Sequence, residues 1–236
     1  MSKCELNLPA HIELKRFESA EDVCIALSDE IETIVTNAVA ARGEASIALS
    51  GGRTPIPMFQ ALSSKALPWD KMTVSLVDDR WVPPTHKDSN EALLIKHLLA
   101  SNPNRTHFIG FWKPDCDAYS AVPLCNESFS GLPEALDCAV LGMGNDGHTA
   151  SIFPESEQLQ NALDTTDTCC AVTPSTAPHD RMTMSAHKLL ASRKRILHLK
   201  GEDKLETLKS AVMDDDIHSM PVRLFLNHPL TIYWSP

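Results

Sequence analysis

Three short, mainly apolar runs in this sequence each end abruptly in a cluster of glycines or charged residues. The runs are Ala45–Leu49, Met72–Val77 and Leu136–Leu141, and the clusters that follow them read SGGRTP, DDR and GMGNDGH. Such runs predict buried strands, and segments with helical spacing of apolar residues lie between them. Strands that alternate with helices predict an α/β fold with a mostly parallel sheet covered on both faces. Because ligands of such sheets bind at the carboxyl ends of the strands, we expect the three clusters to form one site.

Capping residues and apolar spacing place the remaining elements. Ser19 before a long helical pattern and Gly43 after it predict a helix over Ala20–Arg42. Pro114–Pro133 shows little regularity and is interpreted as a broken helix. Further helices are expected from Pro55 to Leu62, at Asn90–Leu99 and at Asp203–Met213. Further strands are expected at Ile12–Phe17, His107–Phe111, Ala171–Thr173, Arg181–Ser185, Arg195–Leu199 and Leu230–Trp234. No linker or internal repeat is evident, so we expect a single domain over residues 1–236.

Composition limits the partners and the compartment. The net charge of −10 argues against a nucleic-acid partner, and an anionic ligand would need cations gathered at one place. The seven cysteines include no C-x-x-C pair, which indicates free thiols in a reducing compartment. The N-terminus lacks the apolar segment of a signal peptide, and no apolar run approaches the roughly 18–20 residues of a membrane span. We therefore expect a cytoplasmic protein without a membrane partner.

The segment Ser50–Pro55 joins a predicted strand to a predicted helix through two glycines. Glycines allow a ligand to approach the backbone closely, and the free N–H groups of a helix N-terminus favour an anion. Arg53 and Thr54 would add a charge and a hydroxyl donor. The segment lacks the Walker A pattern, so it indicates either a different phosphate loop or a tight turn whose glycines serve geometry alone.

The cluster Asp78-Asp79-Arg80 follows the second run. Alone, three charges at this place indicate a solvated turn. The stiff, apolar WVPP segment after Arg80 favours a functional loop instead, and Ser89 is expected to cap the next helix.

The third cluster contains Gly142, Gly144 and Gly147 in the G-x-G-x-x-G spacing of dinucleotide-binding loops. That interpretation requires an apolar helix directly after the glycines, whereas HTASIF has little helix propensity and Pro154 closes the segment. We therefore favour a second interpretation, in which Asp146 and His148 form an acid–base site at a strand end. A histidine beside a carboxylate is suited to general-base work near neutral pH.

Signatures of other hydrolytic chemistries are absent from the sequence. It contains neither G-x-S-x-G nor H-E-x-x-H, and its ten histidines lack metal-ligand spacing. We expect neither a serine or cysteine nucleophile nor catalytic zinc.

Taken together, these segments resemble the 6-phosphogluconolactonase family. SGGRTP is similar to its S-G-G-x-T-P phosphate loop, and GMGNDGHTASIFP closely matches its G-M-G-x-D-G-H-T-A-S-x-F-P signature. DDRWVPPTHKDSN, RMTMS and GEDK are similar to three further family segments and occur in family order, from about residue 47 to residue 204. Asp79 departs from the family pattern, which usually has Glu there.

The resemblance implies a three-layer α/β/α domain with a mostly parallel, Rossmann-like sheet. It also implies hydrolysis of 6-phospho-D-glucono-1,5-lactone to 6-phosphogluconate, the second step of the oxidative pentose phosphate pathway. Neither a cofactor nor a metal is implied. The expected partner is this sugar-phosphate lactone, and we expect a monomer or a weak homodimer.

Site roles follow from the resemblance and from the needs of lactone hydrolysis. His148 is the candidate base, Asp146 would orient it, and Arg80 would stabilise the oxyanion or position the substrate. The candidate substrate- and phosphate-binding residues are Ser50, Gly51, Gly52, Arg53, Thr54, Asp79, Arg181 and Lys204.

Two alternatives stay open. The related glucosamine-6-phosphate deaminase/isomerase family reads G-x-D-G-H-I-A-F-N-E-P at the third cluster, and its Glu takes part in proton transfer. Phe153 holds that position here, which favours hydrolysis. The other alternative is a sugar-phosphate binder without catalytic activity, against which the retained Asp146 and His148 argue.

Overall fold

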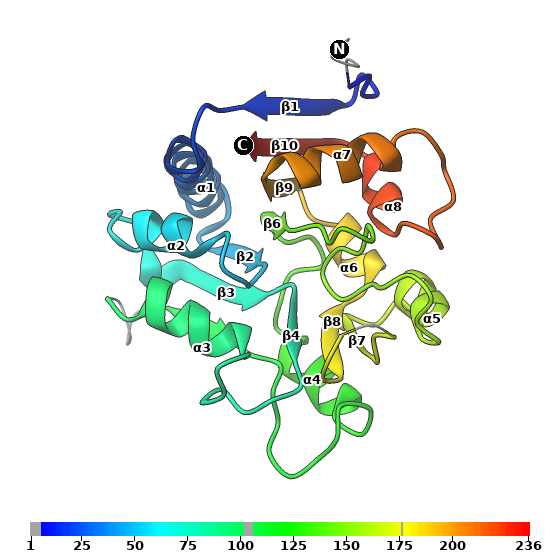
Figure 1. Ribbon diagram of the computed structural model, residues 1–236. Coiled ribbons are helices and arrows are strands. Elements are labelled where there is room, and N and C mark those ends of the chain that lie inside the picture. Colours follow the sequence, from blue (N-terminus) through cyan, green and yellow to red (C-terminus); the bar gives the residue numbers. More distant parts are fainter. Residues whose placement is uncertain (1–5, 102–105, 176) are drawn as a thin grey trace.

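A sheet of seven parallel strands crosses the middle of the computed structural model, which describes residues 6–101, 106–175 and 177–236 (Figure 1). The strand order is β1-β10-β9-β6-β2-β3-β5. Every neighbouring pair in this sheet is parallel, as the sequence predicts. The strands are β1 (Ile12–Arg16), β2 (Ala45–Leu49), β3 (Met72–Leu76), β5 (His107–Ile109), β6 (Cys138–Leu141), β9 (Lys194–Lys200) and β10 (Leu230–Ser235).

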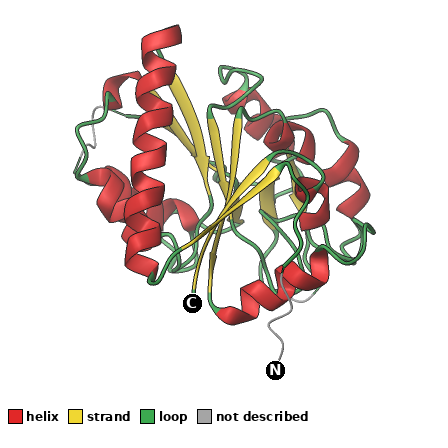
Figure 2. Ribbon diagram, turned by 90° about the horizontal axis from the view of Figure 1, so that it is seen from above, coloured by secondary structure: helices red, strands yellow, loops and turns green. Residues whose placement is uncertain are grey.

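Helices cover both faces of this sheet, which gives the expected three layers (Figure 2). One group contains α1 (Ala20–Arg42), α2 (Ile56–Ser63) and α3 (Asn90–Leu94), which continues into the π-helical segment η2 (Ile95–Leu99). The other contains α5 (Leu159–Asp164), α6 (Ala186–Leu190), α7 (Glu202–Ala211) and α8 (Val222–Leu226), on the right in Figure 1. A 3₁₀ turn, η1 (Trp69–Lys71), precedes β3, and α4 (Val122–Phe129) is the one helix that forms within Pro114–Pro133.

Three short strands form a second, antiparallel sheet. They are β4 (Asp78–Arg80), β8 (Arg181–Met184) and β7 (Cys169–Val172), in the order β4-β8-β7. Asp78-Asp79-Arg80 forms a strand, neither the solvated turn that was weighed nor the loop that was favoured, because both aspartates are buried and the segment pairs with β8.

Helix α1 begins and ends where its capping residues predict. The Ser19 hydroxyl accepts a hydrogen bond from the backbone N–H of Asp22 at 3.1 Å. At the other end, Gly43 has a φ of 83°, and its N–H donates to the carbonyl of Val39 at 2.9 Å. Because a left-handed residue is least strained when it is glycine, Gly43 stops the helix at this position.

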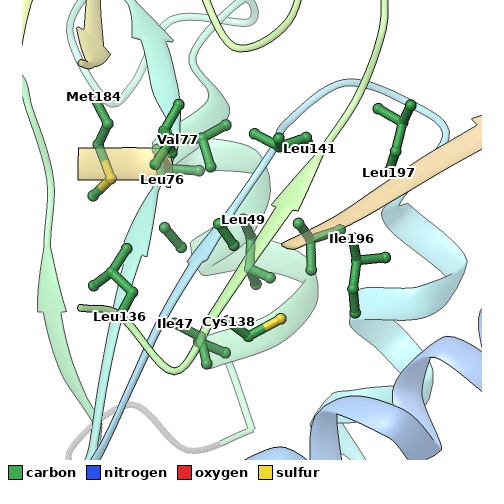
Figure 3. Close-up of a cluster of buried hydrophobic side chains, with 14 of the residues drawn as sticks. Ile47, Leu49, Leu76, Val77, Leu136, Cys138, Leu141, Met184, Ile196 and Leu197 are labelled. Carbon is green, nitrogen blue, oxygen red and sulfur yellow. The ribbon is translucent and has the colours of Figure 1, made fainter. Parts of the chain in front are cut away.

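The hydrophobic core lies around the central strands, where side chains from β2, β6 and β9 pack together (Figure 3). All five residues of β2 and all four of β6 are buried. Strands buried on both faces have no polar face to alternate with, which explains their continuous apolar sequence. Of the helices in the described residues, none is both long and apolar enough to cross a membrane.

Replacement of Leu49 by alanine tests this packing. Leu49 is fully buried in β2, so the variant should lose about 2–5 kcal/mol of unfolding free energy, measured by denaturant titration. Leu124→Ala on α4 is the control, because Leu124 is 47% exposed and should change stability by well under about 1 kcal/mol. Equal losses in the two variants would contradict this assignment of the core.

Candidate active site

A cavity opens at the carboxyl ends of β2 and β6. The next strand of the large sheet lies on one side after β2 and on the other side after β6, so the strand order reverses here. Open α/β sheets bind ligands at such switch points. The cavity volume of about 540 Å³ suits a small molecule. The predicted site residues that line it are Ser50, Gly51, Gly52, Thr54, Arg80, His148, Arg181 and Lys204.

The loop after β6 holds His148 against Asp146. The Nδ1 of His148 lies 2.6 Å from Oδ1 of Asp146, and the same oxygen accepts the His148 backbone N–H at 3.2 Å. Burial opposes ionisation of Asp146, but its hydrogen bonds with His148 and the charge of that ring outweigh burial and lower the pKa of the carboxyl. An ionised carboxylate can only accept, so Nδ1 carries the proton and Nε2 holds the free lone pair.

The glycines of this loop make room for the histidine. A Cβ on Gly144 would lie 2.2 Å from the ring of His148, and a Cβ on Gly147, whose φ is 78°, would lie 2.8 Å from Met220. No helix follows directly, because α5 begins only at Leu159. The G-x-G-x-x-G spacing therefore positions a side chain and does not start the helix that a dinucleotide site requires.

Phe153 forms a wall between the histidine and a cation. Its ring centroid lies 4.2 Å from that of His148, and the guanidinium of Arg181 lies 5.9 Å from the same centroid. An aromatic ring thus occupies the position at which the deaminase pattern has a carboxylate.

Two arginines face each other across the small sheet. Arg80 of β4 pairs with Arg181 of β8 in the antiparallel register, and both line the cavity. Arg181 is only 6% exposed, and its Nε is buried without a hydrogen-bond partner. Burial lowers the pKa of Arg181; the charge of Asp78 opposes this shift, and the smaller effect of Arg80 adds to it. Like charges directly opposite each other on a sheet are unfavourable, so an anionic ligand in the cavity would relieve the repulsion between the two arginines.

Arg80 is held in place by the start of α3. Its guanidinium donates to the carbonyl oxygen of Asp88 at 2.8 Å and to Oδ1 of Asn90 at 3.1 Å. The same Asn90 packs against the glycine loop, because a Cβ on Gly51 would lie 2.0 Å from its side chain. Asn90 therefore connects the loop after β2 to the loop after β4 at the edge of the cavity.

Asp79 lies behind the cavity and does not line it. Its carboxylate accepts the backbone N–H groups of Asn90 at 2.7 Å, Glu91 at 2.9 Å and Arg80 at 2.7 Å, which fixes the first turn of α3. Burial raises the pKa of Asp79 to about 6 although these donors oppose the shift. The predicted substrate-binding residue is thus placed as a support for Arg80 and Asn90.

The side chain of Arg53 also stays away from the cavity and is exposed, although it belongs to the glycine loop. The ammonium of Lys204, by contrast, reaches the loop after β6 and donates to Oδ1 of Asn145.

Several lining residues were not predicted from the sequence. Asp78 accepts a hydrogen bond from the hydroxyl of Ser151 at 2.5 Å inside the cavity wall. His198 of β9 is 6% exposed, and burial, with a smaller effect of Lys200, lowers its pKa to about 4. Asn90 could have been found, because it belongs to the S-N pair after DDR, whereas a lone histidine in an apolar strand gives no signal.

The fold and the site together define an α/β protein with a small-molecule cleft, lined by Arg80, Arg181 and Lys204, at the switch point of its sheet. Residues 18–234 match the model of a family described as glucosamine-6-phosphate isomerases/6-phosphogluconolactonase. The chain is 40% identical to a 6-phosphogluconolactonase of Pseudomonas aeruginosa over the full length of both proteins. It is 38% identical to one of Rhizobium meliloti, with 93% of this chain and 97% of the relative covered.

A solved structure agrees with these relatives. The crystal structure of a 6-phosphogluconolactonase from Shewanella baltica has a TM-score of 0.94 at 39% identity and covers 98% of this chain and 100% of its own. The chain belongs to the 6-phosphogluconolactonase family. A monomeric glucosamine-6-phosphate deaminase has a TM-score of 0.78 at 14% identity, which shows that the two chemistries share the fold.

The carboxyl group of Glu91 provides a test of the packing behind the site. Burial raises its pKa to about 7, and Asp79 contributes to the shift. An unfolded glutamate titrates near about 4.3, so folding favours the protonated form. This contribution to stability is complete below about pH 4 and is lost as the pH rises through about 7.

Glu91→Gln should remove the decrease in stability that ionisation of Glu91 causes as the pH rises. We expect the stability of the parent relative to this variant to fall by about 1 kcal/mol or more between about pH 5 and pH 8, measured by denaturant unfolding. Glu127→Gln on α4 is the control, because Glu127 is exposed and its removal should leave the pH dependence unchanged. A Glu91→Gln variant with the parent's pH profile would contradict the inferred shift.

Proposed function

We propose that the chain hydrolyses 6-phospho-D-glucono-1,5-lactone to 6-phosphogluconate. The full-length similarity to 6-phosphogluconolactonases supports this reaction. One observation about the site carries the proposal: His148, which is hydrogen-bonded to Asp146 behind it, shares a single cavity with the paired cations Arg80 and Arg181. A base and an anion site in one small cavity are what hydrolysis of a phosphorylated lactone requires.

In the proposed mechanism, His148 acts on water. The Nε2 lone pair takes a proton from a water molecule as its oxygen attacks the lactone carbonyl carbon. Asp146 holds the ring in the required tautomer and stabilises the imidazolium that forms. Arg80 faces the developing oxyanion. The ring C–O bond then breaks, the ring oxygen takes the proton back from His148, and the acid product ionises.

The phosphate end of the substrate is assigned to Arg181, Lys204 and the glycine loop. Gly52 has a φ of 89°, and a Cβ there would meet no atom within 4 Å, so the loop presents its backbone to an open space. Ser50, Gly51 and Thr54 complete this wall. Gathering cations at this place allows a protein with a net charge of −10 to hold an anion.

His148→Ala tests the base. The rate of lactone hydrolysis, corrected for the spontaneous reaction, should fall by about 10²–10⁴-fold because general-base catalysis is lost. His187→Ala is the control, because His187 is exposed on α6 and should leave the rate unchanged. A rate within about threefold of the parent in a folded His148→Ala variant would remove this histidine from the role.

Lys204→Ala and Arg181→Ala test the phosphate site. Both should raise KM for the phosphorylated lactone by at least about tenfold and change KM for gluconolactone without phosphate far less. Lys209→Ala is the matched control, since Lys209 lies on the same helix but pairs with Glu206 at 2.6 Å. Equal losses on both substrates would point to damaged folding or to a role in catalysis instead.

Phe153 allows a test of lactone hydrolysis against the deaminase/isomerase reaction of the related family. Glucosamine 6-phosphate should bind weakly through its phosphate and act as a competitive inhibitor, without release of ammonia or fructose 6-phosphate. No carboxylate at position 153 is available for proton transfer. Glu155 lies beyond Pro154 and has a φ of 59°, a different backbone direction. Turnover comparable to the lactonase rate would favour the deaminase/isomerase function.

A further inference from the structure

Two loops bring His86, Asp88 and His179 together on one side of the cavity. His86 and Asp88 lie between β4 and α3, and His179 lies just before β8. The Nε2 of His179 is 3.3 Å from Oδ2 of Asp88, and Nδ1 of His86 is 3.8 Å from the same oxygen. The two imidazole rings meet edge to face with their centroids 5.6 Å apart.

These distances are suited to a metal ion. One donor atom from each of the three side chains lies within 4.8 Å of the other two. Tetrahedral zinc has bonds of about 2.0–2.1 Å, so its ligand atoms lie about 3.3–3.4 Å apart. The His179–Asp88 distance already has this value, and the remaining separations would close with small movements of partly exposed side chains.

The donor atoms of the three groups are also suited to a metal. Nδ1 of His86 accepts the backbone N–H of Asp88 at 3.2 Å, so this nitrogen is unprotonated and a metal would replace only a long hydrogen bond. Nε2 of His179 lies 3.3 Å from Oδ2 of Asp88, and a proton on that nitrogen would be released to solvent when a metal binds there. Two neutral imidazoles and one carboxylate are a common donor set for zinc.

The backbone holds His179 in an unfavourable conformation. Its φ is 68°, in the left-handed region of backbone conformation that residues other than glycine rarely adopt. Strain of this kind persists when neighbouring contacts fix it, and it is concentrated at functional sites. Here it keeps the imidazole beside Asp88 and the edge of the cavity.

We propose that His86, Asp88 and His179 bind a divalent transition-metal ion of the zinc class. The ion joins the β4–α3 loop to the β7–β8 connection, which are also linked by the backbone N–H of Trp81, a donor to the carbonyl of Asp180 at 2.7 Å. Asp88 and His179 line the cavity, and the Asp88 carbonyl holds Arg80, so the ion adds a positive charge to the wall that carries this arginine. It takes no part in the hydrolytic steps assigned to His148.

Equilibrium dialysis of the chelator-treated full-length protein against Zn²⁺ tests the site. The parent should retain one ion per chain. His86→Ala and His179→Ala should each weaken retention by at least about tenfold, because each removes one of three ligands. His218→Ala is the control, since His218 pairs with Asp216 at 3.5 Å without a second histidine in the group. No retention by the parent, or equal retention by all four proteins, would overturn the proposal.

Thermal unfolding and the lactonase assay separate this site from the catalytic one. Zn²⁺ should raise the Tm of the parent and of His218→Ala but not that of His86→Ala. With chelator present, His86→Ala should hydrolyse the lactone at the parent rate. A large loss of that rate in a folded variant would assign His86 to the substrate and not to a metal. Failure of the lactonase proposal would leave the dialysis result unaffected.

Discussion

The parallel pairing of β2 with β6 is the interaction on which the site depends. Their register sets Leu49 beside Val140, and the N–H of Ser50 extends the ladder to the Val140 carbonyl at 2.9 Å. The glycine loop after β2 and the histidine loop after β6 therefore leave the sheet side by side, although about ninety residues separate them in the sequence. Both strands are buried on both faces, so a slip of one residue would exchange the side chains that each strand packs against the two helix layers, and core packing fixes the alignment of the two loops.

Asp79 fixes the side of the cavity that carries Arg80, as the pairing of β2 with β6 fixes the two loops. A carboxylate this deeply buried is unfavourable on its own, and the free N–H groups at the start of α3 compensate for much of the lost hydration. The result is a rigid joint that fixes Arg80 and Asn90 with respect to the glycine loop. The position of Arg80 thus depends on the hydrogen-bonded carboxylate of Asp79 as well as on apolar packing.

The sequence predicted the elements whose signals are local. The caps of α1 and the apolar runs of the central strands were read correctly. Asp146 and His148, two residues apart in the sequence, form a hydrogen-bonded pair, while the catalytic roles given to them stay predictions. The short helices α5, α6 and α8 were missed because five or six residues are too few to show a helical period. β4 was read as part of a functional loop and not as a strand, because its charges find their partners only in the tertiary structure. For the same reason, neither the support role of Asp79 nor the distance of Arg53 from the cavity could be predicted.

The opposed pair Arg80 and Arg181 has a consequence for release of the product. Hydrolysis as proposed converts an ester into a carboxylate, so the molecule that leaves carries one more negative charge than the molecule that enters. Fixed cations attract the more highly charged species more strongly. The arrangement that captures the lactone therefore also retains the acid, and accumulated product competes with fresh substrate for the same two guanidinium groups. A following reaction that consumes the acid would relieve this competition and keep the two guanidinium groups available to the lactone.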